Sequence, residues 1–296
     1  MKLAILYAGQ GSQHPGMGKD LYERYPAFRE AFNAADLDFD LESVCFDDPE
    51  GVLNLTQYTQ PCMVAFAAGV TAVLKENGVK ADDLAGLSLG EYSALEAAGV
   101  FTAKQAIELT AFRGKAMAEA AKGLACGMTA VLGLDREKLS ACCEQAAETG
   151  CVQICNYNCP GQLVISGAVE AVDAACAKLK EAGAKRALRL PVGGAFHSPL
   201  MEPAKVELEK AINEAPFQAP VCPIYQNVDA KPQTDPATIK ANLIAQLTAP
   251  VRWTYIVKNM LADGVTEFTE LGPGNVLQGL IKKVNPEAVV ESKSTL

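Results

Sequence analysis

A serine set between two glycines is the residue whose surroundings most favour nucleophilic chemistry. Ser88 lies in Gly86-Leu87-Ser88-Leu89-Gly90, after a short strand-like run and before a helix-forming one. At a sharp strand-to-helix turn the hydroxyl is exposed at the helix N-terminus, where backbone N–H groups and the helix dipole stabilise a developing negative charge. The same five residues can also form an ordinary Gly/Ser turn, so a catalytic role requires a neighbouring base.

Histidine is the usual base for a serine nucleophile, and the chain contains two histidines. His197 lies in the Gly- and Pro-rich loop 191–201, after the strand-like run 187–190, and such a loop can aim an imidazole into a cleft without strain. His14 lies in a polar, glycine-containing loop and is expected to be solvated. The sequence therefore pairs Ser88 with His197, although a solvated loop histidine is the simpler alternative.

Arg113 is a cation within an otherwise apolar helix face. A Thr102-x-x-Gln105 capping box predicts a helix that runs to about Lys122, with an apolar stripe at positions 106, 109, 117 and 120 that includes Arg113. A buried guanidinium requires an anion. Taken alone, the pattern favours a structural carboxylate, and the alternative is a substrate carboxylate gripped by two N–H groups.

A tight loop follows the first predicted strand. Its sequence, Gly9-Gln10-Gly11-Ser12-Gln13, could bring a backbone N–H and a side-chain amide to a second part of a site. The glycine spacing differs from the G-x-G-x-x-G dinucleotide fingerprint. A plain glycine turn is the alternative.

Composition narrows the class of protein. The 296 residues are 49% hydrophobic, enough for a large core and two domains, and the net charge of −9 argues against nucleic-acid or anionic-membrane binding. No apolar run reaches the roughly 18 residues of a membrane span. Residues 1–9 resemble a buried strand more than a signal peptide, so the ten cysteines indicate free thiols and a cytoplasmic protein. Cys151, Cys155 and Cys159 lack a nearby histidine, and no metal site is expected.

The order of elements predicts an α/β fold. Residues 1–125 alternate strand-like and helix-like segments, as in a parallel sheet, and the region after residue 194 returns to this pattern. Residues 126–193 follow the β-α-β-β-α-β order of a ferredoxin-like unit. We therefore expect a larger α/β-hydrolase-like parallel-sheet domain, residues 1–125 and 194–296, with a small ferredoxin-like domain, 126–193, inserted. Ser88 and His197 flank this insertion, which places the cleft between the two domains.

Seven segments of the chain resemble, in order, the motifs of malonyl-CoA:acyl-carrier-protein transacylase, an acyltransferase family of fatty-acid and polyketide synthesis. These segments are Ala8–Gln13, Gly86–Leu95, Phe112–Met117, Asn156–Gln162, Gly194–Met201, Pro250–Trp253 and Leu271–Leu277. The resemblance covers essentially the whole chain. It implies that Ser88 is the nucleophile, that His197 is the base, and that Arg113 binds the malonyl carboxylate.

The resemblance also implies supporting roles. The oxyanion-hole N–H groups fall on Gln10 and Leu89, and a backbone carbonyl, not an acidic side chain, orients the histidine and falls on Gln246. Leu87 departs from the histidine that the family commonly has before its serine, so the acyl pocket should be more apolar there. Phe196 is expected to line the same pocket and to disfavour an α-methyl group, a discrimination worth about 1–3 kcal/mol.

The implied reaction moves a malonyl group from malonyl-CoA to the phosphopantetheine thiol of acyl carrier protein, by a ping-pong mechanism through a malonyl-serine ester and without a metal or nucleotide cofactor. The acidic carrier protein would need a local basic patch, for which the candidates are Lys185, Arg186, Lys282 and Lys283. Three alternatives remain open at this point: a serine hydrolase or thioesterase, a transacylase for another dicarboxylic acyl-CoA, and a non-catalytic module that binds the carrier protein.

Overall fold

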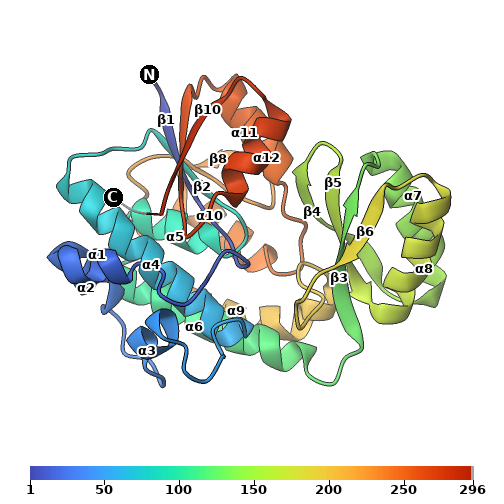
Figure 1. Ribbon diagram of the computed structural model, residues 1–296, viewed down its shortest axis with the longest axis horizontal. Helices are drawn as coiled ribbons and strands as arrows, with labels where there is room; N and C mark the ends of the chain where they lie inside the picture. Colours follow the sequence, from blue (N-terminus) through green and yellow to red (C-terminus); the bar gives the residue numbers. More distant parts are fainter. Residues whose placement is uncertain (295–296) are drawn as a thin grey trace.

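A six-stranded sheet forms the centre of the larger part of the molecule in the computed structural model, which describes residues 1–294 (Figure 1). Its strands are β1 (Leu3–Tyr7), β2 (Asp83–Gly86), β7 (Ile224–Tyr225), β8 (Pro232–Gln233), β9 (Glu267–Leu271) and β10 (Val289–Lys293). Their order is β10-β9-β1-β2-β7-β8, and every pairing is parallel except that of β7 with β8. The predicted parallel sheet is therefore confirmed.

Helices cover both faces of this sheet, as a parallel sheet requires. They are α1 (Lys19–Arg24), α2 (Pro26–Phe32), α3 (Leu41–Phe46), α4 (Thr56–Glu76), α5 (Gly90–Ala97), α6 (Ala103–Ala121), α9 (Glu202–Glu214), α10 (Pro236–Ala245), α11 (Trp253–Ala262) and α12 (Val276–Val284). Ile5 and Tyr7 of β1 pack into one core with α4, α5 and α6, whereas Ala4 and Leu6 pack into a second core with α11 and α12. Within residues 1–294, no helix combines the length and the apolar character needed to cross a bilayer.

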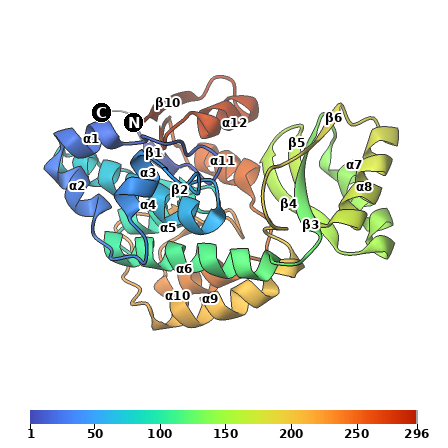
Figure 2. The same cartoon turned by 60° about the horizontal axis from the view of Figure 1, so that its bottom comes forward.

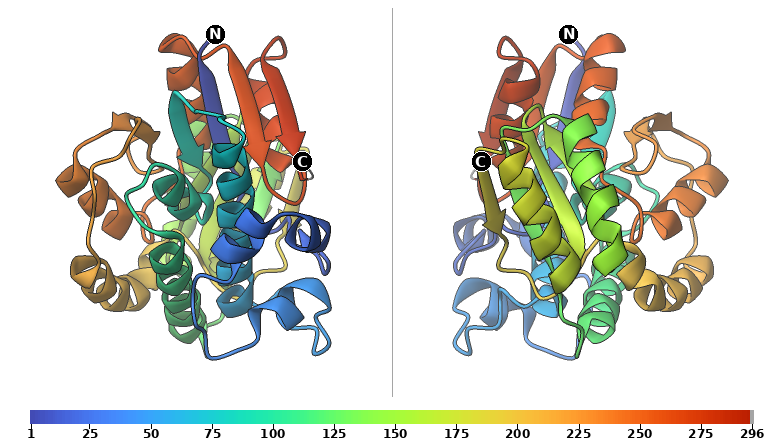
Figure 3. Two further views of the ribbon diagram at one scale, coloured as in Figure 1. Left: turned by 90° about the vertical axis from the view of Figure 1, so that its left-hand side faces the viewer. Right: turned by 90° about the vertical axis from the view of Figure 1, so that its right-hand side faces the viewer.

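A second, four-stranded sheet forms the smaller part. Its elements are β3 (Cys126–Leu132), α7 (Arg136–Ala146), the 3-10 helix η1 (Ala147–Thr149), β4 (Val152–Cys159), β5 (Gln162–Ala168), α8 (Val169–Glu181) and β6 (Arg186–Arg189). The strand order β4-β5-β3-β6, antiparallel throughout, is the predicted ferredoxin-like arrangement. Helices α7 and α8 cover the outer face (Figure 3, right), so the other face is turned toward the large sheet.

Chain crossings and backbone hydrogen bonds join the parts. Helix α6 runs along the large part, and the chain then enters β3 (Figure 2). Val251, between α10 and α11, adds a parallel bridge to the edge of β4, donating its N–H to the Cys155 carbonyl (2.8 Å) and accepting from the Tyr157 N–H (2.8 Å). Backbone hydrogen bonds therefore tie the segment between α10 and α11 of the large part to the small sheet.

One expectation for the N-terminal region is wrong. The structure places four helices, α1 to α4, between β1 and β2, so strands and helices do not alternate there. The reason is packing: Phe28 and Phe32 of α2 lie fully buried against Phe66 and its neighbours on α4, which extends the core beyond the sheet.

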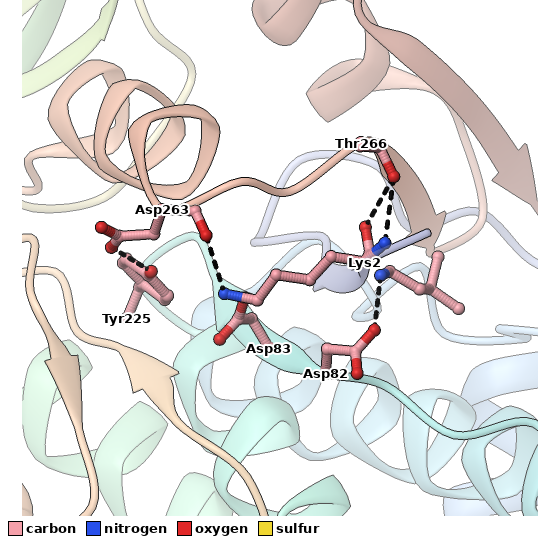
Figure 4. A network of polar contacts seen from close by, with 7 residues as sticks. Lys2, Asp82, Asp83, Tyr225, Asp263 and Thr266 are labelled. Carbon is pink, nitrogen blue, oxygen red and sulfur yellow. Dashed lines mark hydrogen bonds and ion pairs between the residues drawn. The ribbon is translucent and has the colours of Figure 1, made fainter.

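Polar contacts close the amino-terminal edge of the large sheet (Figure 4). The Lys2 ammonium forms an ion pair with the buried Asp83 carboxylate (2.7 Å) and donates to the Asp263 carbonyl (3.3 Å), while the Tyr225 hydroxyl donates to the Asp263 carboxylate (2.5 Å). The Leu3 N–H donates to the Asp82 carboxylate (2.7 Å). These contacts occupy the edge opposite to the carboxyl ends of the strands, where ligands bind in such sheets.

Candidate active site

The order of strands brings three loops together at the carboxyl edge of the large sheet. In the register of β1 and β2, Tyr7 lies opposite Gly86, so the loop with Gln10 ends up beside the loop with Ser88. Strand β7 pairs with β2 on its other side, and its following loop carries Asn227. Parallel strands end at one edge, which is why residues far apart in the chain converge here.

The turn at Ser88 is sharp and too crowded for side chains at the flanking glycines. Ser88 has φ +53°, a left-handed conformation that costs a non-glycine residue about 1–3 kcal/mol. A Cβ on Gly86 would lie 1.9 Å from the Gly90 carbonyl carbon, and one on Gly90 would lie 2.2 Å from the Tyr7 carbonyl oxygen. Close backbone approach, and not flexibility, therefore accounts for the Gly-x-Ser-x-Gly spacing.

Ser88 and His197 are in direct contact. The Ser88 Oγ lies 2.6 Å from His197 Nε2, and His197 Nδ1 lies 2.9 Å from the Gln246 carbonyl oxygen. A carbonyl only accepts hydrogen bonds, so Nδ1 carries the proton and Nε2 is left to accept the serine proton. Burial, together with the charge of Arg113, lowers the pKa of His197 to about 4, which keeps the imidazole neutral at physiological pH.

The expectation that the histidine loop is free of strain is wrong. His197 has φ +57°, also in the left-handed region. Hydrogen bonds to both parts of the molecule hold it there: the Gln153 side chain of β4 donates to the His197 carbonyl (2.9 Å), and His197 Nδ1 donates to the Gln246 carbonyl (2.9 Å). The imidazole is thereby aimed at Ser88 by tertiary contacts that override the local preference of the backbone.

Arg113 lies beside this pair without an ion-pair partner among residues 1–294. Its guanidinium, almost fully buried, donates to the side-chain oxygens of Gln60 (2.8 Å) and Gln246 (3.1 Å) and to Ser88 Oγ (3.3 Å). Among residues 1–294 no carboxylate lies within ion-pair distance of it, so the preference for a structural carboxylate is wrong.

Neutral amide oxygens stand where that carboxylate was expected, and they leave the positive charge of Arg113 in place. Its Nε–H is buried and has no acceptor among the described residues. A buried cation that lines a cleft and has no ion-pair partner among the described residues is suited to bind the carboxylate of a ligand.

A cleft of about 320 Å³ between the two sheets contains these groups. It is lined by Gln10, Gly11, Leu87, Ser88, Leu89, Arg113, Met117, Met128, Asn156, Asn158, Gln162, Val164, Leu190, Val192, Phe196, His197, Val276 and Leu280. The predicted pocket residues Leu87 and Phe196 are among them, whereas Gln246 lies behind the imidazole. His14 is exposed and bonds to the neighbouring Pro15 carbonyl.

Two backbone N–H groups in the cleft are unoccupied. Neither the Gln10 nor the Leu89 N–H has an acceptor within the part of the chain that the structure describes. Leu89 precedes α5, so its N–H belongs to the positive end of that helix. The Gln10 side chain is fixed separately, because its oxygen accepts from the Thr56 hydroxyl at the start of α4 (2.7 Å). The arrangement can receive an oxyanion.

The basic candidates gather mainly at one end of the small sheet. Arg186 pairs with Leu132 of β3, Leu132 pairs with Gln162 of β5, and the Lys283 ammonium donates to the Gln162 side chain (3.0 Å). Lys185 is exposed beside Arg186, and Gln162 lines the cleft. The fourth candidate, Lys282, instead bonds to the Pro286 carbonyl (3.2 Å).

Sequence reasoning missed three buried polar residues that support the site. Gln60 lies among the apolar residues of α4 and orients Arg113, and its polarity within an apolar run was the available signal. Glu91 and Asn227 bond to one another (2.7 Å) and to the serine turn. Glu91 lies three residues after Ser88, but Asn227 follows a two-residue strand with no detectable periodicity.

Two of the three evenly spaced cysteines, Cys155 and Cys159, contact polar groups of β5. Cys155 donates its thiol proton to the Val164 carbonyl and Cys159 lies near the Gln162 side chain. Across the described residues, no three His, Cys, Asp or Glu side chains lie in an arrangement that could hold a metal ion.

Known proteins resemble this chain over nearly its whole length. The family described as "Acyl transferase domain" matches residues 5–293. A malonyl CoA-acyl carrier protein transacylase of Bacillus subtilis is 44% identical over 287 residues, which are 96% of this chain and 90% of that protein.

Solved structures match equally well. An acyl carrier protein S-malonyltransferase from Vibrio cholerae has a TM-score of 0.97 at 43% identity, covering 100% of this chain and 98% of that one. A malonyl-transacylase in complex with its type II PKS acyl-carrier protein has a TM-score of 0.96 at 39% identity, covering 100% of this chain and 97% of that one.

Proposed function

The chain belongs to the acyl transferase family, among the malonyl-CoA–acyl carrier protein transacylases, and from this membership we propose that it loads acyl carrier protein with malonyl groups for fatty-acid synthesis. It transfers the malonyl group of malonyl-CoA to the phosphopantetheine thiol of the carrier protein. The observation that carries the residue assignment is the 2.6 Å contact of Ser88 with His197 beside Arg113, which has no carboxylate within ion-pair distance in the described chain.

The first half-reaction forms an ester on the serine. His197 Nε2 takes the Ser88 proton as Oγ attacks the thioester carbonyl of malonyl-CoA. The N–H groups of Gln10 and Leu89 bind the oxyanion of the tetrahedral intermediate. The intermediate then collapses, the carbon–sulfur bond breaks, and coenzyme A leaves as a thiol with the proton that the imidazolium returns.

The second half-reaction reverses these steps with a new thiol. Arg113 holds the free carboxylate of the malonyl ester while the phosphopantetheine arm of the carrier protein enters the cleft. His197 takes the thiol proton, the sulfur attacks the ester carbonyl, and the bond to Ser88 Oγ breaks. The serine regains its proton from His197, and malonyl-carrier protein leaves.

Acyl selectivity follows from the groups around the ester. An acetyl group offers no anion to Arg113 and leaves a buried cation unpaired. Phe196, which is nearly buried and lines the cleft, restricts the space for an α-methyl group. Leu87 makes the wall before the nucleophile apolar.

The orientation of the base favours a transferase over a hydrolase. In the proposed mechanism, the Gln246 carbonyl holds His197 in the required tautomer. A hydrolase of the Ser-His-acid type usually has a carboxylate at that position, and among residues 1–294 no carboxylate bonds to the imidazole.

Three further assignments complete the proposal. The carrier protein docks near Lys185, Arg186 and Lys283 at the cleft end of the small sheet, with Lys282 at the margin. Residues 1–125 with 194–296 act as one domain and residues 126–193 as the other. We place the enzyme in the cytoplasm, because its ten cysteines are all free thiols.

Intact-protein mass spectrometry tests the proposal. Mixing the enzyme with malonyl-CoA should add the mass of one malonyl group, and the Ser88→Ala variant should show no adduct. Adding carrier protein that bears phosphopantetheine should move the adduct to the carrier. Release of free malonate at the rate of adduct loss, with no malonyl-carrier protein, would show a hydrolase and overturn the proposal.

A further inference from the structure

The carboxamide of Asn227 spans the backbone around the nucleophile. Its Oδ1 accepts from the Ser88 N–H (2.6 Å), and its Nδ2 donates to the Gly86 carbonyl (2.7 Å). The side chain is fully buried in the loop after β7, the strand that pairs with β2. One planar group thus fixes the residues at both ends of the turn.

Glu91 in turn fixes Asn227. Its carboxylate accepts from the Asn227 N–H (2.7 Å) and from the Gln226 side chain (3.1 Å), and its own N–H donates to the Ser88 carbonyl (3.1 Å). The hydrogen bonds therefore form a closed ring that links the serine turn, the first turn of α5 and the loop after β7. The side chains of Asn227, Glu91 and Gln226 are fully buried.

The serine turn needs such a restraint. Ser88 has φ +53°, which a non-glycine residue leaves when nothing holds it, and its Oγ must stay within 2.6 Å of His197 Nε2. The Gln246 side chain donates to the Ser88 carbonyl (3.0 Å), but it does not restrain the Ser88 N–H or the Gly86 carbonyl. Among the described residues, only the carboxamide of Asn227 bonds to both the Ser88 N–H and the Gly86 carbonyl.

We propose that Asn227 is a positioning residue for the transfer reaction: held by Glu91, its carboxamide keeps Gly86–Ser88 in the left-handed turn that directs Oγ to His197. The inference rests on the proposed function only in taking Ser88 as the nucleophile. It goes beyond that function because Asn227 is outside the cleft and touches neither substrate nor the reacting oxygen.

The chemistry of the two bonds suggests a discriminating variant. The position needs an acceptor facing an N–H and a donor facing a carbonyl, which a carboxamide or a protonated carboxylic acid supplies and a carboxylate does not. Asn227→Asp should therefore function while the new acid is neutral and fail when it ionises. Burial and the neighbouring Glu91 carboxylate favour the neutral form of the new acid. The positive charge of Arg113, which bonds to Ser88, favours the ionised form.

Asn242 provides a matched control. It lies on α10, bonds to the Gln226 side chain (3.0 Å) and to the Asp229 carboxylate (3.2 Å), and makes no contact with the serine turn. Asn242→Asp and Asn242→Ala thus disturb the same polar region without loosening the nucleophile. Thermal unfolding of every variant measures the general loss of stability.

The test measures the rate constant of Ser88 acylation by malonyl-CoA in rapid-quench mass spectrometry, between pH 5.5 and 9, for each variant relative to wild type. Using the ratio removes the titrations that the substitution leaves unchanged. Glu91, whose pKa burial raises to about 7, contacts residue 227, so in Asn227→Asp the two acids titrate as a coupled pair and the ratio reports that pair. A misplacement of about 1 Å at a reacting group costs about 100-fold in rate. Asn227→Ala should therefore lose about 100-fold in the acylation rate constant, and in kcat for the full transfer, with KM for malonyl-CoA changed less than about threefold.

The Asp variant supplies the signature that a merely structural role would not produce. Its rate relative to wild type should be near unity at the acidic end and should fall by at least tenfold as pH rises, while both Asn242 variants stay within about threefold throughout. If Asn227→Ala does not fold, the pH profile of Asn227→Asp alone decides whether Asn227 positions the serine turn.

Three results would overturn the inference: wild-type acylation by folded Asn227→Ala, a pH-independent ratio for Asn227→Asp, or equal losses in the Asn242 variants. Labelling by phenylmethanesulfonyl fluoride, in which Oγ–S forms, S–F breaks and His197 takes the proton, separates this inference from the proposed function. If malonyl-CoA does not acylate the wild type, the proposed function fails, and the sulfonylation rates of the variants still test the role of Asn227.

Discussion

Removing the Arg113 guanidinium should abolish the preference for malonyl groups while sparing much of the serine chemistry. In the proposed function the guanidinium binds the carboxylate of malonyl-CoA, which acetyl-CoA lacks. The Arg113→Ala variant therefore separates carboxylate binding from nucleophilic attack, because Ser88 and His197 keep their 2.6 Å contact.

The size of the effect follows from burial. Arg113 is 1% exposed and is held by Gln60 and Gln246, so its pair with a bound carboxylate is shielded from water. Truncating one partner of a buried, hydrogen-bonded charge pair costs about 2–5 kcal/mol, and each 1.4 kcal/mol is about tenfold. We expect kcat/KM for malonyl-CoA to fall on the order of 100- to 1,000-fold.

Acetyl-CoA should lose far less. It forfeits only the 3.3 Å contact of the guanidinium with Ser88 Oγ, worth about 1 kcal/mol or less than tenfold. The variant also loses the charge that helps lower the pKa of His197, so the pKa should rise, and an assay at about pH 8 keeps the imidazole neutral.

Competition between malonyl-CoA and acetyl-CoA directly gives the ratio of malonyl to acetyl adducts on the enzyme. The enzyme is mixed with malonyl-CoA and excess acetyl-CoA, and the two serine adducts are counted by intact mass, so the amount of folded protein cancels. Arg113→Lys, which keeps the charge but not the planar fork, should give an intermediate ratio. Equal losses of both adducts in Arg113→Ala would refute the carboxylate clamp.

Three further predictions concern the base, the pocket and a helix cap. Because burial and Arg113 lower the pKa of His197 to about 4, kcat/KM should hold as pH falls through 6.5 and halve only near pH 4; a half-maximum near 6.5 would contradict this. Phe196→Ala should raise the methylmalonyl-to-malonyl adduct ratio about tenfold, and an unchanged ratio would exclude Phe196 from selecting the acyl group. Thr102→Ala removes the cap that accepts from the Gln105 N–H and should lower the free energy of unfolding by about 1 kcal/mol in urea titration, whereas the exposed control Lys104→Ala should change it little.

Local sequence determined much of the fold. The capping box at Thr102 begins α6, which ends at Ala121, next to the predicted end at Lys122. The β-α-β-β-α-β pattern of residues 126–193 has the expected strand order. These features depend on hydrogen bonds and side-chain periodicity within one element or between neighbours, which the sequence displays directly.

The sequence by itself also predicted Ser88 as the candidate nucleophile, because the Gly-x-Ser-x-Gly spacing is a local pattern. Part of its cause is local, since Gly86 is crowded by Gly90, and part is tertiary, since Gly90 is crowded by Tyr7 of β1. Only the tertiary structure decided what surrounds the serine. It brought His197 across 109 positions in a strained backbone conformation, gave Arg113 amide partners and no ion pair within residues 1–294, and placed Asn227 against the turn. Those outcomes depend on which strands pair and where their loops converge, and a two-residue strand such as β7 leaves no periodic trace from which to infer its neighbours.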